Sequence, residues 1–141
     1  MKSKPDCIFC QIVHKTAPAH VVCEDERTLV FMDLFPVAHG HTLIIPKAHC
    51  DDLFDSDPED LRAVMDVSHR VAQAIDRVLT PAGLGVYQLN RAPAGQTVFH
   101  YHMHLIPRNH GAGLQIHTRV PGDPERMAEI AKRLSEAIRS A

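Results

Sequence analysis

Three histidines stand at every second position in the stretch from residue 98 to residue 106: His100, His102 and His104. Alternate side chains of an extended strand point to the same side, so this spacing predicts three imidazoles on one face of a strand. The residues between and after them, Tyr101, Met103 and Leu105, are predicted to point the other way, into a core. This alternation favours a chemical site on a sheet over a purely structural use of the three rings.

The three rings cannot all serve one small ion. Two residues along a strand advance about 6.6 Å, which places His100 and His104 about 13 Å apart. Neighbouring histidines could share a zinc ion, but metal–nitrogen bonds of about 2 Å leave no room for a third along a straight strand. We therefore expect different histidines of this run to have different roles.

A chain of 141 residues is long enough for one domain, and we expect a single domain over residues 1–141. Hydrophobic residues make up 45% of it and charged residues 23%, proportions that favour an ordinary soluble globular protein. The formal net charge of -2 provides no basic footprint, so no nucleic-acid partner is expected. A small phosphorylated ligand needs only a local cluster of donors and remains compatible with this charge.

The N-terminus begins with positive charge, but the apolar stretch that follows, residues 7–10, is too short for a secretion signal. No run approaches the roughly 18 apolar residues of a membrane-spanning helix. We therefore expect a cytoplasmic protein without a membrane partner. In a reducing compartment the four cysteines are predicted to be thiols or metal ligands rather than disulfides.

The order of strand and helix patterns predicts an α+β fold. Strand patterns lie at residues 21–24, 29–33, 42–45, 85–90 and 98–106. Helical patterns lie at residues 8–13, 58–79 and 123–138. Asp57 is suited to cap the long helix and Pro58 to occupy its first turn. We expect a five-stranded, mostly antiparallel sheet with one long inserted helix and a C-terminal helix, and an exposed loop at residues 111–122.

The stretch Gly95–Ile106 resembles the signature of histidine triad nucleotide-binding proteins. Three further blocks resemble other parts of that family in the same order along the chain: residues 7–12, 31–36 and 40–49. The resemblance implies the family's α+β fold, a purine nucleotide as ligand, and a nucleotidyl transferase or hydrolase that works through a nucleotidyl-histidine intermediate. It also implies a homodimer formed through the long helix and a sheet edge.

The resemblance and elementary chemistry agree on His102 as the nucleophile. A neutral imidazole carries a free nitrogen lone pair near neutral pH without a separate strong base. Attack on phosphorus would form a covalent nucleotidyl-imidazole, which water would then discharge. By resemblance, a main-chain carbonyl holds the other ring nitrogen. His41 and His104 complete the expected catalytic set, although a buried structural role is the alternative for His41.

Phosphoryl transfer requires mainly donors placed around the phosphate oxygens. The positions that match the family's phosphate donors are Asn90, Gln96, Thr97 and His104. The family holds the ribose hydroxyls with an Asp at the position of Asp33, a task that suits a carboxylate because it accepts from both hydroxyls. The residues expected to enclose the base are Ile8, Phe9, Ile12 and Leu34, for which core packing is the alternative.

A zinc site is a separate expectation. Cys7 and Cys10 form a C-x-x-C pair, and with His49 and His100 they would supply two thiolates and two imidazoles for a tetrahedral ion. Related bacterial members of the family carry such a site. The alternatives are two buried thiols beside unrelated histidines, or Cys50 as a substitute ligand.

The remaining histidines show no convincing constellation and are expected at the surface or in packing: His14, His20, His39, His69, His110 and His117. Three functions remain open. The first is hydrolysis of nucleoside 5'-phosphoramidates, with adenosine as the expected nucleoside, and the second is hydrolysis of dinucleoside polyphosphates by the same residues. The third is a zinc-stabilised module that binds a nucleotide or a partner with little turnover.

Overall fold

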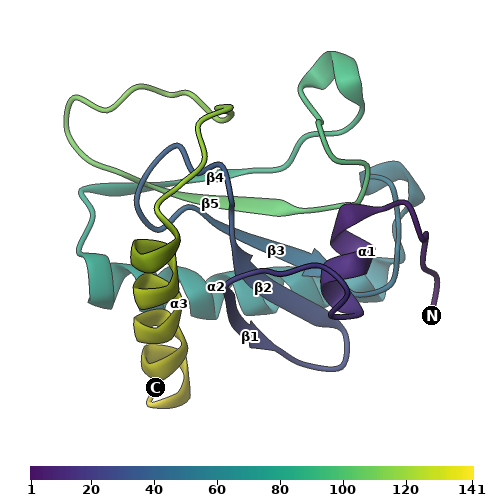
Figure 1. Ribbon diagram of the computed structural model, residues 1–141, viewed down its shortest axis with the longest axis horizontal. Coiled ribbons are helices and arrows are strands. Elements are labelled where there is room, and N and C mark those ends of the chain that lie inside the picture. The colour runs from purple at the N-terminus through teal and green to yellow at the C-terminus, as the bar shows by residue number, and fades with distance from the viewer.

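Five strands form one antiparallel sheet in the order β1-β2-β3-β5-β4 (Figure 1). The strands are β1 (Val21–Glu24), β2 (Thr28–Met32), β3 (Thr42–Pro46), β4 (Gly83–Tyr87) and β5 (Met103–Arg108). The helices are α1 (Ile8–Val13), α2 (Pro58–Leu79) and α3 (Pro124–Arg139). The structure is a computed structural model that describes residues 1–141. The predicted α+β fold with a long inserted helix and a C-terminal helix is confirmed.

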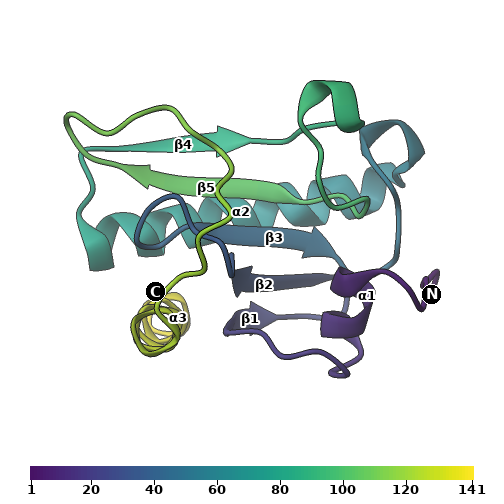
Figure 2. The same cartoon turned by 45° about the horizontal axis from the view of Figure 1, so that its top comes forward.

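The two faces of the sheet are covered differently. Helices α2 and α3 pack on one face, over a large core that contains Tyr101, Met103 and Leu105, as the alternation along the histidine run predicts. The other face carries the short helix α1 above a smaller cluster that includes Phe9 and Phe31. Figure 2 shows α2 behind the sheet and α1 in front of it. The histidine face is therefore the thinly covered one.

Helix α2 begins and ends where its sequence dictates. The Asp57 carboxylate accepts from the backbone N–H of Glu59, and Pro58 occupies the first turn, where no hydrogen-bond donor is needed. At the other end Thr80 has φ 45°, a left-handed conformation that stops the helix while its N–H still bonds to Asp76. The buried residues of α2 recur at three- and four-residue intervals and make it the main support of the sheet.

The strand predicted at residues 98–106 is shifted, because β5 begins only at Met103. Its neighbour β3 ends at Pro46, which has no N–H to donate, and the Pro46 carbonyl accepts a hydrogen bond from Nε2 of His100 instead. The N–H of Tyr101 bonds to the carbonyl of Cys50, outside the sheet. Residues 98–102 therefore stay extended enough to alternate their side chains, but they have no strand partner.

Strand β4 is shifted in the same way, from the predicted 85–90 to 83–87, because its pairing with β5 starts at Gly83 opposite Arg108. Residues 109–123 contain no helix or strand and most of them are exposed, as predicted for 111–122, but residues 116–118 are half-buried. Figure 2 shows this segment crossing the front of β4, β5 and β3 before it enters α3. It therefore lies over the histidine face.

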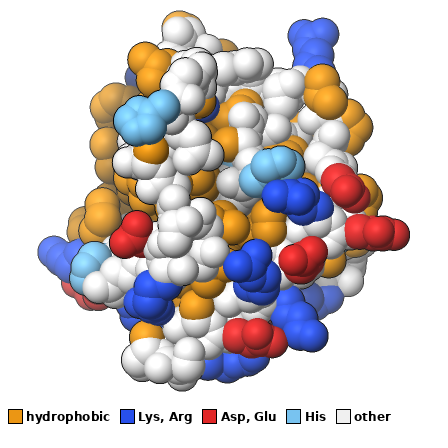
Figure 3. Space-filling view, turned by 90° about the vertical axis from the view of Figure 1, so that its left-hand side faces the viewer, with side chains coloured by type: hydrophobic (Ala, Val, Ile, Leu, Met, Phe, Trp, Pro, Cys, Tyr) orange, Lys and Arg blue, Asp and Glu red, His pale blue; other side chains and the backbone are white.

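None of the helices is long and apolar enough to cross a bilayer. In the side view of Figure 3, acidic and basic side chains lie interspersed on the lower part of the surface, with hydrophobic side chains between them. Charges of both signs thus share this face, consistent with the small net charge.

Candidate functional site

A cavity of about 540 Å³ opens on the histidine face of the sheet. Its apolar wall comes from α1 and the strands beneath it, and its polar wall comes from the end of the histidine run and from residues 117–119. Eight of the residues predicted to contact a nucleotide line it: Ile8, Phe9, Ile12, Asp33, Leu34, Thr97, His102 and His104. The cavity thus has an apolar end and a polar end, as a nucleoside phosphate requires.

His102 lies on the polar wall with one ring nitrogen held and one free. Its Nδ1 lies 2.7 Å from the carbonyl oxygen of His100, so this nitrogen carries the proton and donates it to the carbonyl. Its Nε2 has no hydrogen-bond partner in the protein. Burial lowers the pKa of His102, which keeps the ring neutral. The result is a neutral imidazole with a free lone pair at the cavity.

A chain of hydrogen bonds fixes the tautomers of His41 and His104. The N–H of Val37 donates to Nδ1 of His41 at 3.1 Å, so the proton of neutral His41 is on Nε2. That nitrogen donates to Nδ1 of His104 at 2.9 Å, which places the proton of His104 on its own Nε2. Burial lowers the pKa of His41 to about 3 and that of His104 to about 2, so both rings are neutral.

The Nε2–H of His104 is buried and has no hydrogen-bond partner. A buried donor left unpaired costs about 1–3 kcal/mol, so a ligand that places an acceptor at this position would gain binding free energy by pairing with it. The rings of His102 and His104 lie 4.8 Å apart, centroid to centroid. The cavity is therefore lined by one histidine with a free acceptor nitrogen and one with an unpaired donor nitrogen.

Asp33 lies after β2, at the rim of the cavity. One carboxylate oxygen accepts from the N–H of Phe35 at 2.9 Å, and the other lies 3.3 Å from Nε2 of His41. Burial raises the pKa of Asp33 from 3.8 to about 6. Near neutral pH the group is a carboxylate with spare acceptor capacity toward the cavity.

Asn90 and Gln96, two predicted phosphate donors, do not line this cavity. The Asn90 oxygen accepts from the N–H of Leu53 at 2.7 Å. The Gln96 amide donates to the carbonyls of Asp51 and Val98. Both side chains are therefore engaged in holding the loop around residues 88–98, and the structure does not bring them to His102.

His117 was expected at the surface or in packing, but it lines the cavity. Its ring lies 5.8 Å from that of His104, and its Nε2 lies 2.7 Å from the carbonyl oxygen of Gly95. It stands in the unpatterned segment 109–123, 13 residues after His104, so no spacing rule could have linked the two. The only available signal was the residue type itself.

Cys7, Cys10, His49 and His100 come together beside the cavity, with their potential ligand atoms within 4.8 Å of one another. The sulfur of Cys7 lies 3.4 Å from Nδ1 of His100, and the sulfur of Cys10 lies 3.3 Å from Nδ1 of His49 and 3.6 Å from Nδ1 of His100. Zinc bonds of about 2.3 Å to sulfur and 2.0–2.1 Å to nitrogen give tetrahedral S···N edges of about 3.5 Å. The four side chains therefore fit one tetrahedral zinc ion.

The surroundings of this cluster also suit a metal. Nε2 of His100 donates to the Pro46 carbonyl and Nε2 of His49 donates to Asp51, both at 2.8 Å, which leaves both Nδ1 atoms free toward the sulfurs. Cys50, which the sequence offered as a substitute zinc ligand, lies outside the cluster. It is buried in the main core, and its sulfur accepts a hydrogen bond from the Ser56 hydroxyl.

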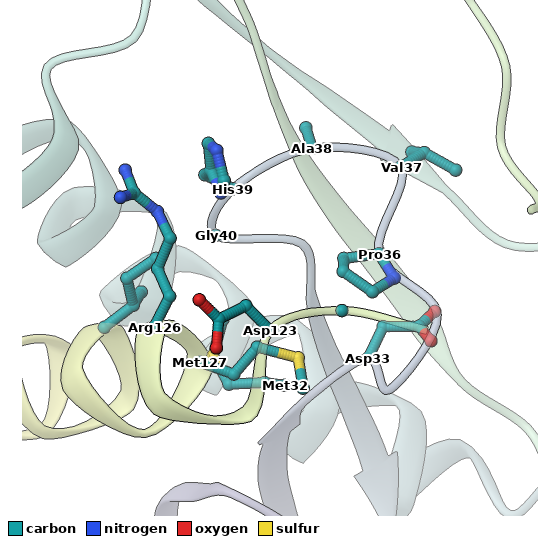
Figure 4. A pocket seen from close by; sticks show the side chains of 12 residues that line it. Met32, Asp33, Pro36, Val37, Ala38, His39, Gly40, Asp123, Arg126 and Met127 are labelled. Carbon is teal, nitrogen blue, oxygen red and sulfur yellow. The ribbon is translucent and has the colours of Figure 1, made fainter. Parts of the chain in front are cut away.

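A second cavity, of about 410 Å³, lies on the other side of the loop between β2 and β3. Figure 4 shows Asp123 and Arg126 from the start of α3 facing His39 and Gly40 of that loop. None of the triad histidines lines it, and its walls hold no buried polar group without a partner. The chemistry thus belongs to the larger cavity.

Known proteins share the fold of this chain and more than a third of its residues over the aligned regions. A curated relative from Borreliella burgdorferi, an uncharacterized HIT-like protein, is 37% identical over 94% of this chain and 99% of its own. The adenylylsulfatase HINT3 of Arabidopsis thaliana is 36% identical over 73% of this chain and 52% of its own. A zinc-bound histidine triad family protein from Mycobacterium smegmatis superposes with a TM-score of 0.84 at 38% identity, covering 96% of this chain and 94% of that one.

The family model described as HIT domain matches residues 14–111. This span contains all five strands, the long helix α2 and the three histidines at positions 100, 102 and 104. The resemblance inferred from the sequence is confirmed: the chain belongs to the HIT family and has the fold of its nucleotide-binding hydrolases.

Proposed function

We propose that this protein hydrolyses nucleoside 5'-phosphoramidates, with adenosine as the nucleoside, through a covalent intermediate on His102. One observation carries the proposal: His102, whose Nε2 is a free acceptor, and His104, whose Nε2–H is an unpaired donor, line the same cavity. An α-phosphate is a group that needs a nucleophile at phosphorus and a donor at its oxygens.

The reaction takes two displacements. In the first, Nε2 of His102 forms a bond to phosphorus while the bond to the leaving amine breaks, and the electron pair of that bond stays on the amine nitrogen. In the second, a water oxygen bonds to phosphorus and the phosphorus–nitrogen bond returns its electron pair to His102. The proton that this water releases balances the one that the leaving nitrogen takes up in the first displacement. Nε2–H of His104 donates to a phosphate oxygen throughout and stabilises the charge that collects there.

The other end of the cavity would hold the nucleoside. Asp33 offers a carboxylate to the ribose hydroxyls, and the apolar wall of Ile8, Phe9, Ile12 and Leu34 offers a surface for the base. The rings of Phe9 and His102 are perpendicular, with their centroids 5.1 Å apart. The base and the nucleophile would thus be positioned by the same helix, α1.

Zinc in the cluster of Cys7, Cys10, His49 and His100 would supply a structural cross-link and no reaction step. These ligands join the N-terminal segment to the end of β3 and to the start of the histidine run. The zinc-bound relative from Mycobacterium smegmatis supports this assignment. The adenylylsulfatase relative supports attack at an α-phosphate, because adenylyl sulfate carries its leaving group on the α-phosphorus.

Hydrolysis of adenosine 5'-phosphoramidate by the wild type and by His102→Ala tests the proposal, with diadenosine polyphosphate and adenylyl sulfate run in parallel. Cleavage of the phosphoramidate that depends on His102 and exceeds the other two is the expected result. Preference for the polyphosphate would instead support the second function from the sequence. Tight AMP binding with no turnover of any of the three would support a binding module.

We also propose a homodimer that uses the free edge of β4. This strand ends the sheet order, and its Val86 side chain is 52% exposed. The side chain of Met65, on the long helix α2, is also 54% exposed and would add apolar surface to such an interface. A mass twice that of the chain by light scattering is expected, and Val86→Asp should shift it toward the monomer.

A further inference from the structure

The segment between β5 and α3 holds His117 in a fixed place over the cavity. The side chain of Arg108 donates to the carbonyl of Gln115, and the Gln115 side chain donates to the carbonyl of His117 itself. Farther along, the N–H of Gly122 bonds to the carbonyl of Leu34. The segment is therefore tied to the end of the sheet on one side of His117 and to the Asp33–Leu34 loop on the other.

The ring of His117 is oriented by the loop beside the histidine run. Its Nε2 donates to the carbonyl of Gly95 at 2.7 Å, so its Nδ1 is left without a protein partner. Gly95 has φ 107°, a conformation that favours glycine, and its carbonyl oxygen is the partner of His117. His117 is half-buried, whereas His102 and His104 are buried. It is thus the histidine of this cavity that keeps access to water.

The proposed reaction needs a group that can give a proton to the leaving nitrogen, because an amide anion is a very poor leaving group. His104 cannot do this as a neutral ring, since its one proton would have to be lost from a neutral imidazole. His102 is occupied as the nucleophile, and Asp33 faces the ribose end. His117 remains as the cavity histidine with an uncommitted nitrogen.

We propose that His117 is a catalytic residue that protonates the leaving amine, which makes leaving groups with a basic nitrogen the favoured substrate class of this site. The proposal rests on the proposed function and deepens it. In the first displacement the proton on Nδ1 of imidazolium His117 passes to the leaving nitrogen as the phosphorus–nitrogen bond breaks. In the second, the attacking water gives a proton to Nδ1 of His117 and restores the imidazolium. One water is consumed, and one nucleotide and one amine are released.

Leaving-group dependence tests this role. The two substrates are adenosine 5'-phosphoramidate, whose leaving nitrogen needs a proton, and the 4-nitrophenyl ester of AMP, whose leaving phenolate does not. In His117→Gln the amide can still donate to Gly95 but cannot transfer a proton. In single-turnover measurements of leaving-group release, which report the first displacement alone, this variant should cleave the phosphoramidate at least about 100-fold more slowly and the ester within about threefold of the wild-type rate. His110→Gln, an exposed histidine of the same segment, should match the wild type on both substrates.

Each other outcome has a definite meaning. Equal slowing of both substrates by His117→Gln would overturn the acid role and indicate that His117 only positions the segment. Unchanged cleavage of both substrates would also overturn the acid role. Unchanged melting temperature and AMP affinity of the variant show that a selective loss is chemical. A wild-type protein that cleaves neither substrate would overturn the proposed function itself. If the wild type cleaves both substrates and His117→Gln changes both rates to the same extent, only the role of His117 is overturned.

Discussion

His100 and His102 stand two residues apart on the same extended stretch, yet the structure prepares them in opposite ways. Nε2 of His100 donates to the Pro46 carbonyl, which leaves Nδ1 free toward the sulfurs of Cys7 and Cys10. Nδ1 of His102 donates to the carbonyl of His100, which leaves Nε2 free at the cavity. The same side chain thus offers opposite nitrogens at the two places.

The comparison teaches that the role of each ring is set by the partner of its second nitrogen rather than by its position in the repeat. The two regions meet at two residues. His100 contributes its ring to the cluster and its backbone carbonyl to His102, and the ring of Phe9 packs against both histidine rings. Because substitution of the His100 side chain leaves its backbone carbonyl in place, mutations should be able to disrupt the cluster without disrupting the cavity.

Removal of the nucleophile should have the largest effect. His102→Ala is expected to reduce turnover by at least about 1,000-fold, because His104 carries its proton on the unpaired Nε2 and the proposed role of His117 is to deliver a proton rather than to attack phosphorus. Adenosine affinity and the melting temperature should change little, as measured by calorimetry. Residual turnover above a tenth of the wild-type rate would remove His102 from this role.

Disruption of the cluster should be the next largest effect, and it should act on stability. Cys7→Ser with Cys10→Ser is expected to lose bound zinc by elemental analysis and to lower the melting temperature by about 10 °C or more, since the ion joins three separate segments. Turnover should fall far less than in His102→Ala. Cys23→Ser, which lies outside the cluster, is the matched control and should keep its zinc.

A smaller effect is expected at Asp33. Burial raises the pKa of this side chain to about 6. Adenosine, which has no titrating phosphate, should bind more weakly as the pH falls through 6, because protonation removes an acceptor from the ribose site. Asp33→Asn should bind about 10-fold more weakly at pH 7 and lose this pH dependence. Titrations of both proteins at several pH values provide the measurement.

The same raised pKa has a consequence for stability. A carboxyl group that holds its proton more tightly when folded destabilises the folded state as the pH rises from about 4 to about 6, and the loss persists above that range. Asp33→Asn should therefore melt at a higher temperature than the wild type at pH 7, while the two converge at low pH. Lower stability of the variant at pH 7 would contradict the buried carboxylate.

The smallest effect concerns the partner of a cluster ligand. Asp51 accepts from Nε2 of His49, so Asp51→Asn should weaken zinc binding by about 10-fold in competition with a chelating dye. Turnover should stay within about twofold of the wild type. A fall in turnover that matched the fall in zinc affinity would show that the two regions are more strongly coupled than the shared residue His100 implies.

The fold was predictable because its signals are local. The cap at Asp57 and the three- and four-residue spacing fix α2, and the alternation at 100–105 gives the correct faces for the histidines and for Tyr101, Met103 and Leu105. The start of β5 was not predictable, because it depends on where the pairing with β3 ends. The last paired residue of β3 is Ile44, and the carbonyl of Pro46 bonds to the side chain of His100 rather than to a strand. The extended conformation and the paired strand are separate properties, and the pattern predicts only the first.

The site could be predicted in part. The resemblance named the four residues that form the cluster and eight of those that line the cavity, because each lies in a recognisable block. It could not place Asn90 and Gln96, whose side chains are engaged by backbone groups of distant loops. It also missed His117, because tertiary hydrogen bonds alone bring that segment over the sheet.

The tautomers of the histidines in the zinc-loaded protein, read from long-range ¹⁵N–¹H correlation spectra, test the central claim most directly. The account predicts His102 protonated on Nδ1 with a bare Nε2, and His100 protonated on Nε2 with Nδ1 bound to metal. Assignment of both signals is secured by comparison with His102→Gln. A wild-type spectrum in which His102 carries its proton on Nε2 would contradict the account, because the nitrogen facing the cavity would then be a donor and not a nucleophile.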